Sequence, residues 1–263
     1  MRALMLALAL CVAALDAHAA EPVAFEAVYE AAVTNWKLPG EVDEVTGSQI
    51  VRPEKTGTDW VLAANFRLAA AAPDGRAIDF DSSLSATEAR DGNRYRFRSE
   101  TRMRDQSLGV LAGQASRPTA GQPGRIQFTE PEARTVPLPH DALFPVASFF
   151  WTAALWEKGQ KTASYVLFDG TTPEPVRVFE LLTAMPGKPH PMPEGDIKLL
   201  DAKAWRTTGS FHSYAGNESS EPITTLTQTV LANGIATELA LDIGIADVTL
   251  RLRRIRALAE PKC

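Results

Sequence analysis

Cysteine and histidine are scarce in this chain, and their scarcity excludes several kinds of functional site. The sequence has two cysteines, Cys11 and Cys263, and four histidines. Cysteines at opposite ends of a chain cannot form the closely spaced pairs that bind zinc or exchange disulfides. The glycine-rich phosphate loops, the GxSxG elbow of hydrolases and the HExxH zinc motif are absent as well. We therefore predict a non-enzymatic protein with no catalytic residue, no metal site and no cofactor.

Excess positive charge is also lacking. The formal net charge is −5, whereas a nucleic-acid-binding surface needs a dense cluster of Lys and Arg to displace counterions. We therefore expect no nucleic-acid partner. Mild acidity excludes neither proteins nor lipids as partners.

Long hydrophobic runs are limited to one, and it is too short to span a membrane. It extends from Ala3 to Leu15, about 13 residues where a membrane helix needs roughly 20. Met1-Arg2 places a positive charge before the run, and Ala17 and Ala19 place small residues after it. These features are typical of a secretory signal peptide. We predict that residues 1–19 are removed before Ala20 and that the protein is exported to the periplasm of a Gram-negative bacterium.

The predicted mature chain, residues 20–263, has no transmembrane segment and one cysteine. Cys11 lies in the predicted signal peptide, which leaves Cys263 as the sole thiol and excludes an intramolecular disulfide. An odd cysteine in an oxidising compartment either stays free or joins a disulfide with another molecule. The sequence leaves both alternatives open.

What the sequence does contain is a strong alternation of apolar and polar residues, the period of a β-strand with one buried face. Turn signals separate the runs at Asp91-Gly92, Asp169-Gly170 and Asn233-Gly234, where glycine permits the positive φ of a tight turn. The apolar positions of the clearest runs are Phe25, Ala27, Tyr29, Ala31 and Val33, then Trp60, Leu62, Ala64, Phe66 and Leu68, then Tyr95, Phe97 and Met103, and finally Val248, Leu250, Leu252 and Ile255.

This pattern predicts one mostly β domain over residues 20–263, a size that a single β-barrel can use. Two stretches rich in proline and glycine, residues 115–124 and 186–193, are interpreted as surface loops because the strands on both sides look alike. The Arg251–Arg256 cluster is interpreted as the charged outer face of the last strand. We predict a single antiparallel, open or spiral β-barrel of about 12–14 strands.

One segment departs from the alternation and predicts a helix over about residues 142–158. Asp141 can accept hydrogen bonds from the first amides, Pro145 is acceptable in a first turn, and Gly159 is a suitable stop. A helix that is apolar nearly all round must be buried on most sides. We expect it to pack on, or plug, the concave side of the sheet. Its large apolar residues are Phe144, Phe149, Phe150, Trp151, Leu155 and Trp156.

The remaining polar candidates do not form a convincing active site. His140, Asp141 and Ser148 are the residue types of a catalytic triad, but triad members usually come from distant segments. We interpret them as the loop and cap of the helix. His190 lies among prolines and His212 on a predicted strand, each without a second ligand nearby in the sequence. Glu130 and Glu132, with a proline between them, are interpreted as an exposed acidic loop.

Several short segments of the chain, taken in order, carry a family resemblance. They are Ala27-Val28-Tyr29, Gly57–Leu68, Arg90–Phe97, Leu138–Pro145, Leu167–Gly170, Asn233-Gly234 and the terminal cysteine. Together they resemble the EipB-like cell-envelope integrity family of alphaproteobacterial periplasmic proteins, over nearly the whole of Phe25 to Cys263. Within these segments we expect a structural role for Trp60, Gly92, Pro145, Gly170 and Gly234.

The resemblance implies many antiparallel strands wound into an open, spiral-like barrel around a helix. It also implies a periplasmic location and a non-enzymatic role in envelope integrity through protein contacts. One departure concerns Cys263: family members carry a cysteine shortly before the strand tryptophan that pairs with the C-terminal one. Here that stretch reads Gly57-Thr58-Asp59-Trp60. A cross-link closing a loop of about 200 residues would contribute on the order of 5 kcal/mol, which this chain forgoes.

Two functions from different classes fit these expectations. The first is a periplasmic scaffold that binds another envelope protein through exposed strand edges or loops. The alternative is a carrier or binding protein for a lipid or other amphiphile, because a curved sheet around an aromatic helix can enclose an acyl chain.

Overall fold

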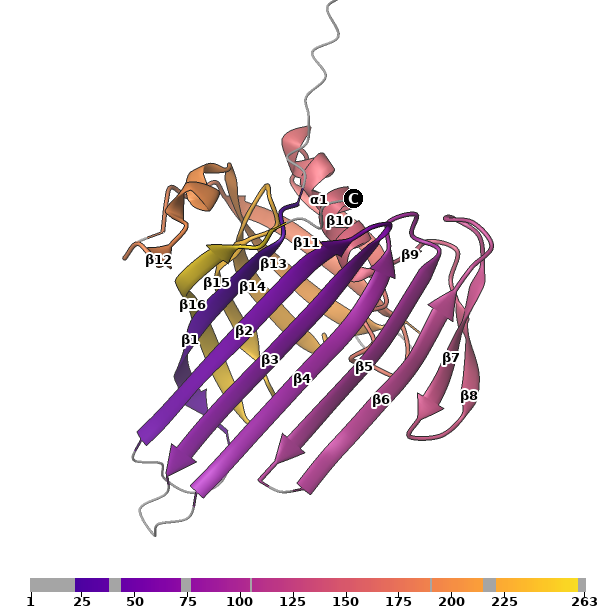
Figure 1. The fold of residues 1–263 in the computed structure, drawn as a ribbon, viewed down its shortest axis with the longest axis horizontal. Coiled ribbons are helices and arrows are strands. Elements are labelled where there is room, and N and C mark those ends of the chain that lie inside the picture. The colour runs from indigo at the N-terminus through magenta and orange to yellow at the C-terminus, as the bar shows by residue number, and fades with distance from the viewer. Residues whose placement is uncertain are drawn as a thin grey trace, which may run out of the picture.

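The protein is described here by a computed structural model, which covers residues 22–37, 44–71, 77–104, 106–189, 191–214 and 221–259. The predicted signal peptide, His190 and Cys263 lie outside the described residues. Sixteen strands of the described chain belong to one sheet, accompanied by one α-helix and one short 3-10 helix (Figure 1).

The first half of the chain is an antiparallel meander in which each strand pairs with the next. Long alternating runs joined by tight turns produce it, as at Gly92, whose φ is +69°. Its strands are β1 (Phe25–Trp36), β2 (Glu44–Thr56), β3 (Asp59–Ala71), β4 (Ala77–Ala89), β5 (Arg94–Met103), β6 (Gln106–Ser116), β7 (Gly124–Glu130) and β8 (Arg134–Leu138).

The second half adds the helices and returns the chain to its start. Its elements are β9 (Ala142–Leu143), α1 (Pro145–Glu157), β10 (Thr162–Leu167), β11 (Val176–Ala184), β12 (Glu194–Gly195), the 3-10 helix η1 (Ile197–Asp201), β13 (Ala204–Ser213), β14 (Thr224–Leu231), β15 (Ala236–Asp242) and β16 (Ala246–Ala257). Because β16 pairs antiparallel with β1, the first and last strands meet in the middle of the sheet.

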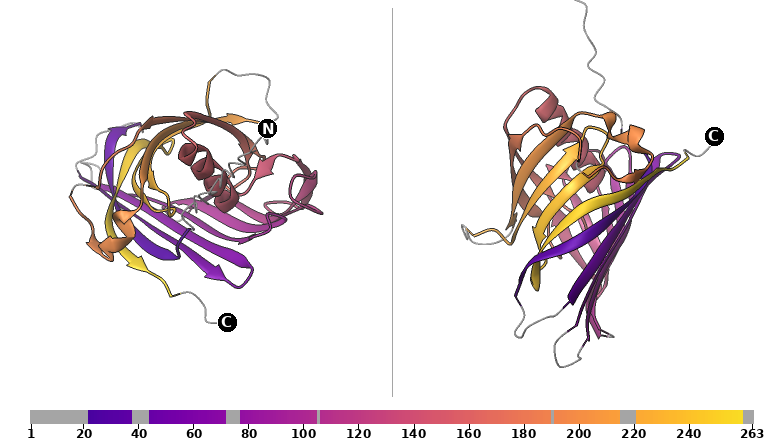
Figure 2. Two further views of the ribbon diagram at one scale, coloured as in Figure 1. Left: turned by 90° about the horizontal axis from the view of Figure 1, so that it is seen from above. Right: turned by 90° about the vertical axis from the view of Figure 1, so that its left-hand side faces the viewer.

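The sheet curls into a barrel whose two free edges, β8 and β9, are consecutive in the chain. Seen from above, α1 lies inside the ring of strands (Figure 2). The predicted β-barrel around a helix is therefore confirmed. Fourteen strands have five or more residues; the other two, β9 and β12, have two residues each and pair in parallel with β10 and β16. Two-residue strands leave no periodicity in a sequence, so the pattern could not indicate them.

The last strand illustrates how alternation and a bulge together set the barrel wall. Leu252 and Ile255 both face the interior although three positions separate them, because the pairing with β1 shifts register between Arg254 and Leu252. The arginines of this strand point outward, where Arg253 pairs with Glu30 and Arg256 pairs with Glu26. The charged outer face predicted for Arg251–Arg256 is confirmed.

A cluster of aromatic rings joins the two sides of the barrel near its free edges. Tyr95 stacks on Phe144, with ring centroids 5.1 Å apart, and Phe97 meets Phe168 edge-on at 5.2 Å. The Tyr95 hydroxyl donates a hydrogen bond of 2.7 Å to the carbonyl oxygen of Asp169. These contacts tie β5 to Phe144, just before α1, and to the segment that follows β10. Buried aromatic packing therefore joins the two sides of the barrel, whose edge strands β8 and β9 do not pair with each other.

The helix begins later than the sequence predicts, and its cap is different. The predicted range was about 142–158, whereas α1 extends from Pro145 to Glu157. Asp141 was expected to cap the helix; that prediction is wrong, because Phe144 occupies the N-cap position and caps no amide with its side chain. Residues 142–143 form β9 instead. Pro145 does stand in the first turn, and Gly159 follows the helix with a φ of +77°.

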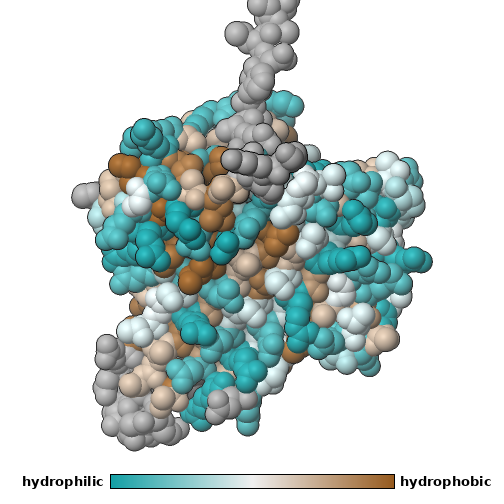
Figure 3. All heavy atoms as spheres, viewed as in Figure 1, coloured by the Kyte–Doolittle hydropathy of each residue, from teal (hydrophilic) through white to brown (hydrophobic). Residues whose placement is uncertain are grey.

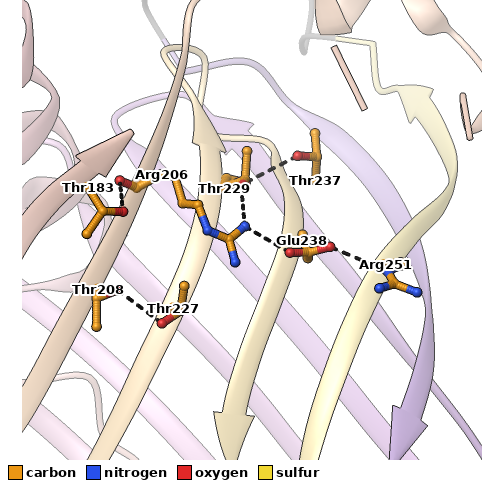
Figure 4. Close-up of polar contacts among 8 residues, drawn as sticks. All are labelled: Thr183, Arg206, Thr208, Thr227, Thr229, Thr237, Glu238 and Arg251. Carbon is orange, nitrogen blue, oxygen red and sulfur yellow. Dashed lines mark hydrogen bonds and ion pairs between the residues drawn. The ribbon is translucent and has the colours of Figure 1, made fainter. Parts of the chain in front are cut away.

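The outer face of β13 to β16 carries a ladder of polar contacts, shown in Figure 4. Arg206 donates to the Thr229 hydroxyl at 3.2 Å and to Glu238 at 2.9 Å, and Arg251 approaches the same carboxylate at 3.4 Å. The hydrogen bond from Arg206 is the main reason that the pKa of Glu238 lies below its usual value. Thr208 and Thr227 add a cross-strand hydroxyl pair at 3.1 Å. The ladder stabilises the register of these strands.

Gly170 offers a direct test of the aromatic cluster. Its φ is +76°, and an added Cβ would lie 2.5 Å from the Phe97 ring. We predict that Gly170→Ala lowers the free energy of unfolding by about 2–5 kcal/mol, combining left-handed strain and overpacking, measured by chemical denaturation. Gly121→Ala is the matched control, because Gly121 has a φ of +80° with no atom near its added Cβ. Equal losses for the two variants would contradict the packing account.

Candidate functional site

A cavity of about 420 Å³ lies inside the barrel, between α1 and the strands on both sides of it. A volume of this size is within the range of small-molecule sites. Its walls are mostly apolar and come from segments far apart in the sequence. They include Phe25, Val51, Trp60, Leu62 and Leu84 from β1 to β4, Phe149, Ala153 and Trp156 from α1, and Tyr165, Trp205, Phe211 and Leu226 from β10 to β14.

The cavity exists because the strand alternation places apolar side chains inside and α1 covers part of them. On β2, Val51 and Pro53 line the cavity. The adjacent Ile50 is 42% exposed on the outer face of the strand. On α1, Ala153 and Trp156 are buried against Trp205 of β13. The prediction that the helix packs on the concave side of the sheet is confirmed, although Trp151 on its outer side is 39% exposed.

Glu88 fixes the helix in this position. It is buried on β4, and its two carboxylate oxygens accept hydrogen bonds of 2.8 Å from the backbone amides of Val146 and Ala147. A carboxylate at a helix N-terminus satisfies amides that have no partner within the helix and complements the helix dipole. The capping group predicted from Asp141 is therefore supplied by a residue 58 positions away in the chain.

Burial strongly perturbs this carboxyl group. Desolvation raises the pKa of Glu88 to about 7, and the hydrogen bonds from Val146 and Ala147 oppose the rise only in part. The folded protein therefore has a buried acid that titrates close to neutral pH, at the point where α1 meets the barrel.

Most polar groups around the cavity already have partners within the protein. Ser148 and Thr152 donate to helix carbonyls at 2.8 and 3.0 Å, and the Asn233 amide donates to Leu199 at 2.7 Å. The Asp169 carboxylate accepts from the backbone and hydroxyl of Thr171 at 2.9 and 2.8 Å. These bonds support the walls, and they use the donors of Ser148, Thr152 and Asn233 and one carboxylate oxygen of Asp169.

Two buried groups at the cavity are less well satisfied. Glu180 on β11 is 7% exposed, and the one hydrogen bond found for its carboxylate comes from the Tyr165 hydroxyl at 3.4 Å. The indole nitrogen of Trp205 is fully buried without a hydrogen-bond partner. Burial beside Glu180 raises the pKa of Tyr165 above its usual value, so its hydroxyl keeps its proton and acts as a donor.

The residues expected from the sequence to be structural fall in two groups. Trp60, Pro145 and Gly234 line the cavity. Gly92 turns the chain between β4 and β5, and Gly170 packs against the aromatic cluster. Glu88 and Glu180 were missed, although a signal was available: each is a carboxylate at an inward position of an alternating strand.

The other polar candidates do not converge on the cavity. His140 and Asp141 are exposed, with 3.9 Å between Nδ1 and Oδ1, and the Ser148 hydroxyl bonds to Pro145 rather than to them. His212 contacts Ser210 at 3.1 Å and the ring of Phe179. Glu130 pairs with Arg98. Within the described ranges, no three His, Cys, Asp or Glu side chains are grouped as metal ligands. That the protein is not an enzyme stays a prediction.

A second hollow, of about 730 Å³, lies along β5 to β8. Polar side chains such as Arg96, Gln114 and Gln127 form much of its lining, and Arg134 there stacks on the Phe128 ring at 4.8 Å. It lacks a buried polar group without a partner, in the part of the chain that the structure covers. The interior cavity is therefore the better candidate site.

Comparisons with known proteins agree with the fold. The model of the EipB-like family matches residues 16–259. Among solved structures, a beta-barrel-like protein from Brucella abortus with a domain of unknown function superimposes with a TM-score of 0.79 and 17% sequence identity, covering 92% of this chain and all of that one. A search of curated proteins finds no match. Among the described residues, none of the helices is long and apolar enough to cross a bilayer.

The pKa of Glu88 predicts how stability changes with pH. Between pH 4.5 and about 7 the folded protein keeps a proton on Glu88 that the unfolded chain loses, so stability falls as the pH rises through this window. We predict that wild type loses roughly 3 kcal/mol more than Glu88→Gln across it, measured by urea unfolding at several pH values. The exposed Glu132→Gln should behave like wild type. Parallel pH profiles for wild type and Glu88→Gln would contradict this account.

Proposed function

Because this chain belongs to the EipB-like family, we propose that it is a periplasmic, non-enzymatic protein that supports the integrity of the cell envelope by binding another envelope component. The family and the barrel fold fit a periplasmic envelope protein. The predicted signal peptide and the absence of known catalytic motifs from the sequence support the location and the lack of enzymatic activity.

The interior cavity favours an amphiphile as the bound component. Its walls are predominantly apolar, and its volume of about 420 Å³ is suited to one acyl chain with a compact head group. Closure by α1, which Glu88 holds at its N-terminus, would keep the chain of the ligand away from water. This cavity is the observation that carries the proposal.

Adjacent positions on β2 provide a test of binding in the cavity. Val51 lines it, whereas Ile50 faces outward. We predict that Val51→Trp weakens binding of a neutral, single-chain fluorescent amphiphile at least tenfold, since the indole occupies the ligand volume, and that Ile50→Trp leaves binding unchanged. Titration followed by fluorescence measures both, with circular dichroism to verify folding. Unchanged binding by a folded Val51→Trp protein would place the ligand elsewhere.

A second candidate function, binding of an envelope protein, is favoured by the distribution of exposed apolar side chains. Five of the nine large exposed ones in the described chain belong to the segment from β11 to η1: Phe179, Leu181, Met185, Met192 and Ile197. Figure 3 shows apolar side chains at the upper left, where β12 and η1 lie in Figure 1, whereas β11 lies on the far side of the barrel in this view. On β11, Phe179 and Leu181 are two positions apart and share the outer face. Neighbouring exposed apolar side chains of this kind are typical of protein-binding surfaces.

This second function predicts that the outer face of β11 is needed to bind a protein. We expect Phe179→Ser combined with Leu181→Ser to abolish capture of a specific periplasmic protein by the tagged, folded chain. Leu108→Ser, which changes a residue 57% exposed on β6, should leave capture intact. Mass spectrometry of the retained proteins measures the difference. Equal capture by all three proteins would rule out this face as the binding surface.

A further inference from the structure

Glu180 is a buried carboxylate without a cationic partner among the described residues. It is 7% exposed, faces the cavity from β11, and receives one long hydrogen bond, from Tyr165 at 3.4 Å. A buried acid normally carries several hydrogen bonds or an opposite charge, because loss of its hydration is costly. Among the described residues, neither a cation nor a set of backbone amides meets this carboxylate. A donor on a bound molecule would supply what is missing.

The neighbourhood of Glu180 has room for that donor. Gly209 of β13 lies opposite Glu180 in the pairing with β11 and has no side chain to fill the space beside it. A Cβ added at Gly209 would be 3.5 Å from the ring of Phe211, which also lines the cavity, and 3.9 Å from the Glu180 Cγ, so both are at ordinary contact distance. Gln228, two pairs further along β13 and β14, also lines the cavity, and its side-chain amide can donate or accept a hydrogen bond. The polar groups are thus grouped on the β11–β14 wall, opposite the apolar wall of β1 to β4.

Contrast with Glu88 shows that the two buried carboxylates differ in role. Glu88 is satisfied by two short bonds to α1 and does not line the cavity. Glu180 lines the cavity and is nearly unsatisfied. Glu88 therefore has a structural role at the helix, whereas Glu180 is available to a ligand in the cavity.

We propose that Glu180, supported by Tyr165 and Gln228, makes the cavity selective for single-chain amphiphiles whose head group donates hydrogen bonds or is cationic, and against those with an anionic head. The apolar chain lies against β1 to β4 and α1, and the head group donates to the Glu180 carboxylate. An anionic head would bring a second negative charge against a buried one. This inference rests on the proposed binding of an amphiphile in the cavity.

Three ligands with the same twelve-carbon chain test the selectivity: dodecylamine, 1-dodecanol and dodecanoate. Each competes with a neutral, single-chain fluorescent probe at pH 7.5, below its micellar concentration or, for 1-dodecanol, below its solubility limit. A hydrogen bond to a charged group contributes about 1.5–3 kcal/mol, or roughly 10–100-fold in affinity. We expect the wild type to bind dodecylamine and 1-dodecanol at least tenfold more tightly than dodecanoate. In Glu180→Gln, dodecylamine should lose about tenfold and dodecanoate should gain.

The matched control is Glu54→Gln, which removes the same charge from the outside of β2, where Glu54 pairs with Arg52. It should leave all three affinities as in the wild type, which separates a local effect from the charge of the whole protein. Similar affinities for the three ligands in the wild type, or equal responses of the two variants, would overturn the selectivity while leaving amphiphile binding in place. Failure of the probe and of all three ligands to bind the folded wild type would overturn both proposals.

Discussion

The two hydrogen bonds from α1 to the Glu88 carboxylate are the constraint on which the candidate site depends. A helix of 13 residues that is apolar nearly all round has no preferred face, so hydrophobic burial alone does not fix its rotation or depth in a barrel. Glu88 fixes both, because two amides at one helix end must meet two oxygens of one side chain. With the helix end held, Ala153 and Trp156 face Trp205, and the space left between helix and strands is the cavity.

The barrel closes in part through the pairing of its first and last strands. These strands, β1 and β16, pair along nearly their full length. The two unpaired edges of the sheet belong to β8 and β9, which follow each other in the middle of the sequence. Exposed edges invite association with other chains. Here the aromatic cluster around Tyr95 and Phe144, together with the hydrogen bond from Tyr95 to Asp169, joins the two sides near those edges. The same cluster anchors the segment that leads into α1, so closure of the barrel and placement of the helix are coupled.

The sequence predicts the strands of the barrel better than it predicts the position of the helix and the cavity inside the barrel. Alternation identifies the inward residues of β1, such as Tyr29, and turn glycines such as Gly92 identify the hairpins, because both are local effects of strand geometry. The start of α1 was placed too early because Asp141 is a good local cap, whereas the actual cap comes from β4. The cavity could not be predicted, since its walls combine residues as distant as Phe25 and Leu226.

A polar residue at an inward strand position is the signal most worth extracting from such sequences. Glu88 and Glu180 are both at such positions. Glu88 accepts hydrogen bonds from the start of α1, and Glu180 faces the cavity. Native mass spectrometry of the protein purified from its host without detergent tests the central claim most directly. The account predicts a population with one amphiphile per chain, released on collisional activation. A bare polypeptide mass alone, in protein that remains folded, would contradict it.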